Sequence, residues 1–435
     1  MARLGEGPRH ELGREETDDD EEDHGKAREV ADRDVATYRA LFATRGFVRL
    51  VLSMLLGRLS TTMLQLTLIL FALQRFHSPT VAGAVVFLAV APGLVLSPIA
   101  GALLDRHGRA RLVVVDYVVA AASVALIAAL ALADALPVAA LLAIVTLTSL
   151  TNPLSAAGMR SLFPVMVPSR LWARANAIDA NGYLVAAVFG PAAAGAIYAA
   201  FGPDAALFAV SATYVAAAVS ASGIADPTEQ RAHGPLLREA WSGLRYVVRN
   251  RTLRALAIGV STASAASGIY LIALPVLLLS RIGVREDVVG RLYALYGVGG
   301  FFAGLLFGRL STIDRERRLL ALAYVINAGL ILVVLFVPQL IAVAGAMLLL
   351  GAVSGPTNVV MFTLRQRRTD PQWFGRAFAV SMSMNYAGNP VGSALAGAII
   401  PVSLEAALAC AAFLYVAAGV LSAVGIPTHD DPAGS

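Results

Sequence analysis

Long apolar segments alternate with short polar connections over most of the chain. Each apolar segment is close to or above the roughly 20 residues that a helix needs to cross a bilayer. The pattern therefore predicts twelve transmembrane helices, at residues 47–74, 80–104, 112–133, 138–159, 176–200, 204–224, 254–280, 288–308, 319–337, 340–364, 376–400 and 405–426.

The composition agrees with a membrane protein. The chain is 57% hydrophobic and 14% charged, with a mean hydropathy of +0.70, whereas soluble domains carry about 25% charged residues. A transmembrane barrel would need alternating apolar and polar positions, and these runs are continuous. A single cysteine, Cys410, and six scattered histidines exclude a disulfide framework and a Cys/His metal cluster. We expect no metal, no cofactor and no enzyme activity.

The two halves of the chain resemble each other at a separation of about two hundred residues, counted directly along the sequence. Asn152-Pro153, Arg160, Trp172 with Arg174, and Gly190-Pro191 recur as Asn358, Arg365, Trp373 with Arg376, and Asn389-Pro390. Such a duplication predicts two related six-helix bundles with a solute site between them near the middle of the membrane. The expected organisation is an acidic disordered tail at 1–45, bundles at 46–224 and 254–426, a linker at 225–253 and a second tail at 427–435.

The distribution of arginine predicts the orientation, because cytoplasmic loops retain positive charge. With the N-terminus inside, twenty arginines fall at the inner loops and only four, Arg75, Arg281, Arg285 and Arg291, at the outer ones. Both termini are therefore expected in the cytoplasm. The basic excess needs no nucleic-acid partner, and nothing in the first 45 residues has the apolar stretch of a cleaved signal peptide.

The connection between the second and third predicted helices holds a compact motif, formed by Gly101, Asp105, Arg106, Gly108, Arg109 and Arg111. Gly101 lets helices approach, Asp105 can pair with arginines or a helix N-terminus, and Gly108 turns the chain. The motif resembles the loop signature of the major facilitator superfamily, from which it departs only at Ala110. By that resemblance, Asp105 would hold the cytoplasmic side shut against the start of the eleventh helix. The second half keeps Gly304 and Arg309 but lacks the aspartate, so one such latch is expected.

The fifth predicted helix contains Gly182, Gly190-Pro191 and Gly195. These residues resemble part of the glycine-proline signature of the superfamily's antiporters, although several of its glycines are alanine here. Proline beside small residues also allows bending and close packing in any helical bundle. The resemblance favours the twelve-helix drug/proton antiporter-like exporters.

Arg58 lies about eleven residues into the first predicted helix, where a lone arginine facing lipid costs roughly 2.5–3.5 kcal/mol. It shares one helix face with Thr61, Thr62 and Gln65, by spacings of three, four and seven. That face is expected to line a cavity. Arg58 could contact an anionic or carbonyl-bearing solute, perturb a nearby carboxylate, or simply tie the helix to backbone carbonyls.

Two carboxylates, Asp116 and Asp179, fall within apolar runs, both in the cytoplasmic third of the membrane. No acid is expected opposite Arg58 by depth. Either aspartate could carry a coupled proton or be a permanent partner of Arg109, Arg111, Arg160 or Arg174, and pairing is favoured for both. Asp179 is the first candidate for a proton carrier and Asp116 the second.

In the superfamily, helices 1, 4, 7 and 10 surround the cavity, which implies a set of wall residues here. With residues of helix 11 added, the set is Arg58, Thr62, Gln65, Thr148, Asn152, Ser264, Tyr270, Asn358, Asn385 and Tyr386. The same residue types also serve helix association.

These features together predict a monomeric secondary transporter of the cell (inner) membrane that exports small organic molecules in exchange for protons. Uptake of an anionic solute with Arg58 as counter-charge remains an alternative. A membrane receptor or scaffold that kept the fold without transporting is another.

Overall fold

A computed structural model describes residues 37–226, 236–307, 315–370 and 373–427. The described residues form helices joined by short turns and no strands. Eleven of the described helices are long and apolar enough to cross a membrane, and α14 is a twelfth long helix. The long helices are α3 (Phe47–Phe76), α4 (Pro79–His107), α5 (Arg109–Leu132), α6 (Val138–Met166), α7 (Trp172–Phe201), α8 (Pro203–Ser222), α10 (Arg251–Val276), α11 (Glu286–Phe307), α12 (Glu316–Phe336), α13 (Leu340–Arg367), α14 (Phe374–Ile399) and α15 (Leu404–Gly425).

The twelve predicted helices are confirmed, and most of their ends agree within a few residues. The largest difference is in α6, which continues from residue 159 through Arg160 to Met166. Hydropathy marks where the chain meets the hydrocarbon, whereas a helix can continue into the polar interface because its backbone hydrogen bonds are internal. Four short helices complete the described chain: α2 (Tyr38–Ala43), η1 (Ser169–Leu171), α9 (Leu236–Arg249) and the π-helical η2 (Leu277–Ile282).

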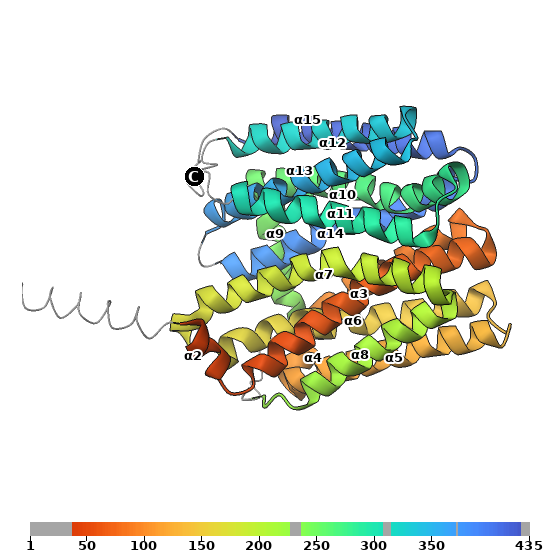
Figure 1. Cartoon of the computed structure of the whole chain (residues 1–435). Coiled ribbons are helices and arrows are strands. Elements are labelled where there is room, and N and C mark those ends of the chain that lie inside the picture. Colours follow the sequence, from red (N-terminus) through yellow and green to blue (C-terminus); the bar gives the residue numbers. More distant parts are fainter. Residues whose placement is uncertain (1–36, 227–235, 308–314, 371–372, 428–435) are drawn as a thin grey trace, which may run out of the picture.

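Two six-helix bundles lie side by side, α3–α8 and α10–α15 (Figure 1). In the first bundle α3 packs on α7 and α8, α5 on α6 and α8, and α4 on α6. In the second bundle the equivalent pairs recur, with α10 on α14 and α15, α12 on α13 and α15, and α11 on α13. This repeated pairing confirms the duplication seen in the sequence and gives the two bundles a pseudo-two-fold relation.

The bundles meet along a surface that we call the seam, formed by α7 against α11 and α4 against α14. One end of the molecule, at the left in Figure 1, holds α2 and the first turns of α3, α7, α10 and α14; we call it the α2 end. The far end contains the turns at His77, Gly202 and Gly283, all with positive φ.

The seam is tightly packed towards the far end. A Cβ added to Gly83 of α4 would lie 2.6 Å from the Ser393 carbonyl oxygen of α14, and one added to Gly195 of α7 would lie 2.9 Å from the Gly290 Cα of α11. Thr80 Oγ1 donates to the Gly397 carbonyl oxygen at 2.7 Å. Only glycine lets the backbones approach this closely, so the far end is closed by direct helix contact.

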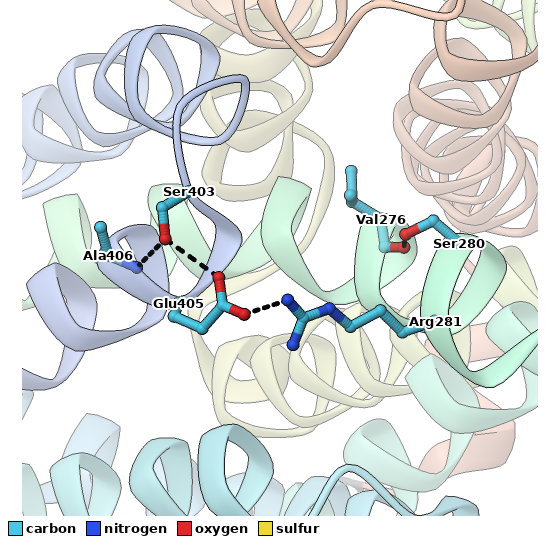
Figure 2. Close-up of polar contacts among 6 residues, drawn as sticks. All are labelled: Val276, Ser280, Arg281, Ser403, Glu405 and Ala406. Atoms are coloured by element: carbon cyan, nitrogen blue, oxygen red, sulfur yellow. Dashed lines mark hydrogen bonds and ion pairs between the residues drawn. The ribbon is translucent and has the colours of Figure 1, made fainter.

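A further far-end contact lies within the second bundle. Arg281, in η2, forms an ion pair with Glu405 at the start of α15 (Figure 2). Ser403 Oγ donates to the second carboxylate oxygen of Glu405 at 2.9 Å and accepts from the Ala406 N–H at 3.1 Å. The cap of α15 and the end of η2 are thereby joined.

Candidate transport site and gating loop

Arg58 of α3 and Asp179 of α7 form an ion pair inside the first bundle. The Arg58 Nη2 atom contacts Asp179 Oδ1, and Nη1 donates to the Asp179 carbonyl oxygen at 2.7 Å. Their side chains are only 14% and 21% exposed. A guanidinium that donates to both a carboxylate and a carbonyl recovers much of the free energy that its charge loses on removal from water.

This pair corrects the expectation that no acid lies opposite Arg58. Arg58 is eleven residues into α3 and Asp179 seven residues into α7. At 1.5 Å per residue the two Cα atoms differ in depth by about 6 Å, a distance that one extended arginine side chain covers. From the sequence, only the depths of the Cα atoms were compared, and this contact was therefore missed. The pairing of Asp179 with an arginine was predicted.

Tyr183, one turn beyond Asp179, contacts two guanidinium groups. The Arg58 Cζ lies 3.5 Å from the centroid of the Tyr183 ring, and the Arg160 Cζ lies 5.4 Å from it. Arg160 Nη2 also donates to the Tyr183 hydroxyl at 2.7 Å. Nothing in the sequence singled out Tyr183, because a tyrosine in an apolar helix is not unusual; its partners on α3 and α6 become visible only in the fold.

Asp116, on α5, is 2% exposed. The hydroxyl groups of Ser155 and Thr151 on α6 lie beside it. One of its oxygens, Oδ1, has no hydrogen-bond partner, and no arginine pairs with it within the part of the chain that the structure describes. The expected pairing of Asp116 with an arginine is thus not found there. A buried carboxyl group among neutral hydroxyls can be uncharged at a much lower cost than it can be charged.

Two cavities contain several of the predicted wall residues. The first measures 290 Å³ and lies among α3, α4, α5, α6 and α8; it is lined by Gln65 and Asn152 together with Thr61, Thr148 and Tyr214. The second measures 140 Å³ and lies inside the second bundle; its polar lining includes Asn358, Asn385 and Tyr386, with Ser264. A further cavity of 210 Å³ in the first bundle is lined by Arg58, Asp179 and Gly182. Several residues that the sequence singled out therefore do line shared cavities.

Two predicted wall residues are engaged inside the bundles. The Thr62 Oγ1 atom lies 3.0 Å from the carbonyl oxygens of Arg58, Leu59 and Ala186, directly beneath Gly190, where a Cβ would overlap it. Tyr270 is buried, and its hydroxyl contacts the Met347 sulfur at 3.3 Å. These contacts are those of helix association.

A buried arginine of the second bundle was noticed in the sequence only as a repeat of Arg160. Arg365, on α13, is fully buried and contacts the Met382 sulfur at 2.7 Å. The neighbouring donors and acceptors assign the Asn385 amide with its oxygen toward Arg365; in this orientation it accepts from Arg365 Nη2 and donates to the Ser381 carbonyl oxygen at 3.1 Å. The apolar run around Arg365 hides this role, because the partners lie on another helix.

The loop between α4 and α5 turns at Gly108, which has φ of 89°. The Arg109 and Ala110 backbone N–H groups both donate to one carboxylate oxygen of Asp226, at 2.5 and 3.1 Å. Arg109 Nη1 donates to the Ser161 carbonyl oxygen at 2.8 Å, and Arg106 is exposed. Asp226 therefore caps α5 from the segment that leaves the first bundle. The only feature of the sequence that could have indicated this cap is the position of Asp226, an acidic residue that follows the apolar run at 204–224.

The side chain of Asp105 lies outside what the structure describes, so its predicted contact with the eleventh helix, which is α14, stays a prediction. Gly101 lies in α4, within the last two turns before Gly108. On α7, Gly190 and Gly195 make the close contacts described above, and a Cβ added to Gly290 of α11 would overlap the Pro191 carbonyl oxygen. The glycine-proline segment of α7 is therefore a packing surface for both α3 and α11.

Two duplicated six-helix bundles that enclose polar cavities define a major facilitator superfamily transporter. The chain matches the transmembrane secretion effector family over residues 36–433. It is also 39% identical over 405 residues to the uncharacterized MFS-type transporter y4rN of Sinorhizobium fredii, covering 91% of this chain and 98% of that one. The chain therefore belongs to this family of the major facilitator superfamily; it is a multi-pass membrane transporter and not an enzyme.

A more distant relative is the multidrug efflux pump Tap of Mycobacterium tuberculosis, 26% identical over 363 residues, with 80% of this chain and 86% of Tap covered. Among solved structures, an inward-facing bacterial homologue of the iron transporter ferroportin matches with a TM-score of 0.67 at 19% identity, covering 87% of this chain and 98% of that chain. The peptide transporter POT in complex with sulfate matches with a TM-score of 0.68 at 14% identity, covering 87% and 94%. At these identities the two structures establish the fold alone.

Proposed function

We propose that this transporter exports small organic molecules across the cell (inner) membrane by alternating access, as a monomer and in exchange for protons. The α2 end is assigned to the cytoplasm because the arginine-rich loops lie there, which would put both termini inside. The relative Tap, a multidrug efflux pump, supports export rather than uptake.

The observation that carries the proposal is the difference between the two ends of the seam. Glycine-to-backbone contacts close it at the far end, whereas in the half toward the α2 end Tyr183 and Tyr386, on the helices that face the other bundle, are 44% and 55% exposed. A site reachable from the cytoplasm and sealed from the outside is the state in which an exporter loads its substrate. Export then requires the far-end contacts to separate and the α2 end to close.

The loop at Gly101, Asp105, Arg106, Gly108 and Arg109 is the proposed gate at the α2 end. Its attachment to Asp226 supports this role, because Asp226 begins the segment that connects the two bundles. A movement of one bundle against the other would be transmitted to the start of α5 through this cap. Gly190 and Pro191 would form the matching pivot on α7.

For the proton-carrying group, Asp116 is a better candidate than Asp179. Asp179 is committed to Arg58 through a largely buried ion pair, and its protonation would leave that guanidinium without a counter-charge. Asp116 has only neutral hydroxyl groups as near partners and keeps one oxygen without a hydrogen bond. The same pairing weighs against uptake of an anion by Arg58, since its charge is already neutralised.

Transport by inverted membrane vesicles tests the proposal. Vesicles that contain the full chain should accumulate members of a panel of fluorescent amphiphiles of both charges when a pH gradient is imposed, and should release them when an ionophore removes that gradient. Asp116→Asn should abolish gradient-driven accumulation while retaining exchange between labelled and unlabelled compound.

Asp134→Asn is the matched control, because Asp134 follows the other end of α5 and pairs with Arg75 on the surface. It should transport like the unaltered chain. Accumulation that is unaffected by the ionophore would contradict proton exchange, and accumulation by no compound in either direction would contradict transport of this substrate range.

A further inference from the structure

Three side chains from both bundles lie near the seam, in the half of the membrane toward the α2 end. Tyr183 lies eleven residues into the 30-residue α7 and Tyr386 twelve residues into the 26-residue α14, so the two phenols stand at nearly the same depth, about 17 Å along their helices from the α2 end. Arg160, on α6, donates to the Tyr183 hydroxyl. Tyr386 is near enough to Tyr183 and Arg160 for electrostatic interaction with both.

Arg160 carries the uncompensated charge of this group. The Arg58 guanidinium beside the Tyr183 ring is neutralised by Asp179, whereas Arg160 is exposed and, among the residues that the structure describes, pairs with no carboxylate. Its one polar partner there is a neutral phenol. A guanidinium at the polar interface of the α2 end, open to water and held by a phenol, is available to a second, anionic partner.

We infer that Arg160, Tyr183 and Tyr386 form a binding site for aromatic organic anions, an assignment of substrate class that rests on the proposed export function. The guanidinium of Arg160 takes the carboxylate, or another single anionic group, of the substrate. The exposed Tyr386 ring, with the amide-lined cavity of Asn358 and Asn385 behind it, takes the aromatic portion. Because α6 and α7 belong to one bundle and α14 to the other, a bound anion bridges the seam.

Organic cations fit this site poorly. Tyrosine rings can attract cations through their faces, but the Tyr183 ring already has the Arg58 guanidinium 3.5 Å from its centroid and Arg160 at 5.4 Å. A third positive group would meet the uncompensated charge of Arg160. We therefore expect the affinity to depend more on the charge of the ligand than on the size of its ring. Apolar contacts change the binding free energy only modestly when a ligand gains or loses a small group.

Binding to the purified full chain in nanodiscs tests the site with three ligands of one shape. The probes are 2-naphthoate, the neutral 2-naphthamide and the cationic 2-naphthylmethylammonium, and their dissociation constants are measured by titration calorimetry. The naphthoate should bind about tenfold or more tightly than the amide, as a charge-assisted hydrogen bond implies. The ammonium compound should bind more weakly than both.

Variants identify the groups responsible. Arg160→Gln should lose the preference for naphthoate and bind naphthoate and naphthamide equally, Arg160→Lys should retain part of the preference, and Tyr386→Leu should weaken both ligands together. Arg170→Gln is the control, because Arg170 is an exposed arginine in η1 at the α2 end. Equal binding of the anion and the cation, or an undiminished anion preference in Arg160→Gln, would overturn the assignment.

The same variants separate the site from the function. If vesicles export neutral or cationic compounds and Arg160→Gln does not alter this, the export function holds and the anion site is wrong. If no compound is exported but naphthoate binding depends on Arg160, the site holds and the export function is wrong.

Discussion

The two bundles repeat one helix arrangement but differ in the polar groups that they bury. The first bundle holds ionisable groups within the membrane: the Arg58–Asp179 ion pair and the buried carboxyl group of Asp116. In the second bundle the described carboxylates lie at helix starts or in a loop, at Glu286, Asp287, Glu316, Asp370 and Glu405; Glu316 is buried there in an ion pair with Arg367. Its interior is lined instead by amides and phenols around Arg365.

The difference teaches that duplication fixed the packing surfaces and left the interior chemistry free to diverge. The helix pairs are equivalent in the two bundles because each pair must bury the same kind of apolar surface. Polar groups inside a membrane are costly unless they are used or partnered. The ionisable groups of the first bundle are therefore its functional candidates, and the amides and phenols around Arg365 in the second suit a solute.

Breaking the ion pair of the first bundle should have the largest effect on stability. Arg58→Met leaves Asp179 buried without its guanidinium, which should lower the free energy of unfolding by about 3 kcal/mol, at the lower limit for buried pairs because both side chains retain some exposure. Denaturation of the detergent-solubilised protein, followed by circular dichroism, measures the change.

The double variant Arg58→Met/Asp179→Leu is the control for that prediction. Removing both charges also removes the unpaired one, so the double variant should be more stable than Arg58→Met alone. A double variant that is the less stable of the two would mean that Arg58 acts through its packing and its contact with Tyr183 rather than through Asp179.

In the second bundle, losing the hydrogen-bond partner Asn385 of Arg365 should lower the stability by less than losing the ion pair does in the first bundle. Asn385→Leu removes the amide that accepts from Arg365, at an expected cost of about 1–3 kcal/mol for a lost hydrogen bond to a charged group. Asn358→Leu, at an exposed position of the same cavity, should change the stability by less than about 0.5 kcal/mol. Equal losses from both variants would contradict a specific role for Asn385 at Arg365.

Replacing the unpaired acid of the first bundle should change transport without a matching change in stability. Asp116→Asn preserves the shape of the side chain and its hydroxyl neighbours, so the free energy of unfolding should change by less than about 1 kcal/mol. Gradient-driven accumulation in vesicles should nevertheless be lost. A loss of stability as large as that of Arg58→Met would assign Asp116 a structural role instead.

The fold could be predicted from the sequence more fully than the site. Apolar runs place helices because each must span the hydrocarbon, and residues such as Gly195 and Gly108 mark close contacts and turns directly. Gln65, Asn152, Asn358 and Asn385 were predicted wall residues, and they do line cavities. Polar residue types in apolar helices are informative because they are rare there.

The partners of those residues could not be predicted in the same way. Asp179 was expected to pair with an arginine of the α2 end and instead contacts Arg58, since a long side chain reaches across depth and since the rotation of one helix against another is set by packing. Asp226, Tyr183 and the contacts of Arg365 were missed for the same reason. Each depends on which faces of two helices meet, and one sequence carries that information only weakly.

The smallest effect on stability is expected at the far end of the second bundle. The ion pair there, like the Arg58–Asp179 pair of the first bundle, joins an arginine to a carboxylate, but it lies in a different environment. Arg281 and Glu405 are about half exposed, at 45% and 46%, and Glu405 has Ser403 as an alternative partner (Figure 2). Water solvates both charges when they separate, so an exposed pair contributes little. Arg281→Gln should therefore denature like the unaltered chain in the same detergent, and Ser403→Ala, which removes the cap of α15, should be the more destabilising of the two. If Arg281→Gln proved as damaging as Arg58→Met, the contrast between a largely buried ion pair in one bundle and a half-exposed ion pair in the other would no longer explain where this transporter depends on charge.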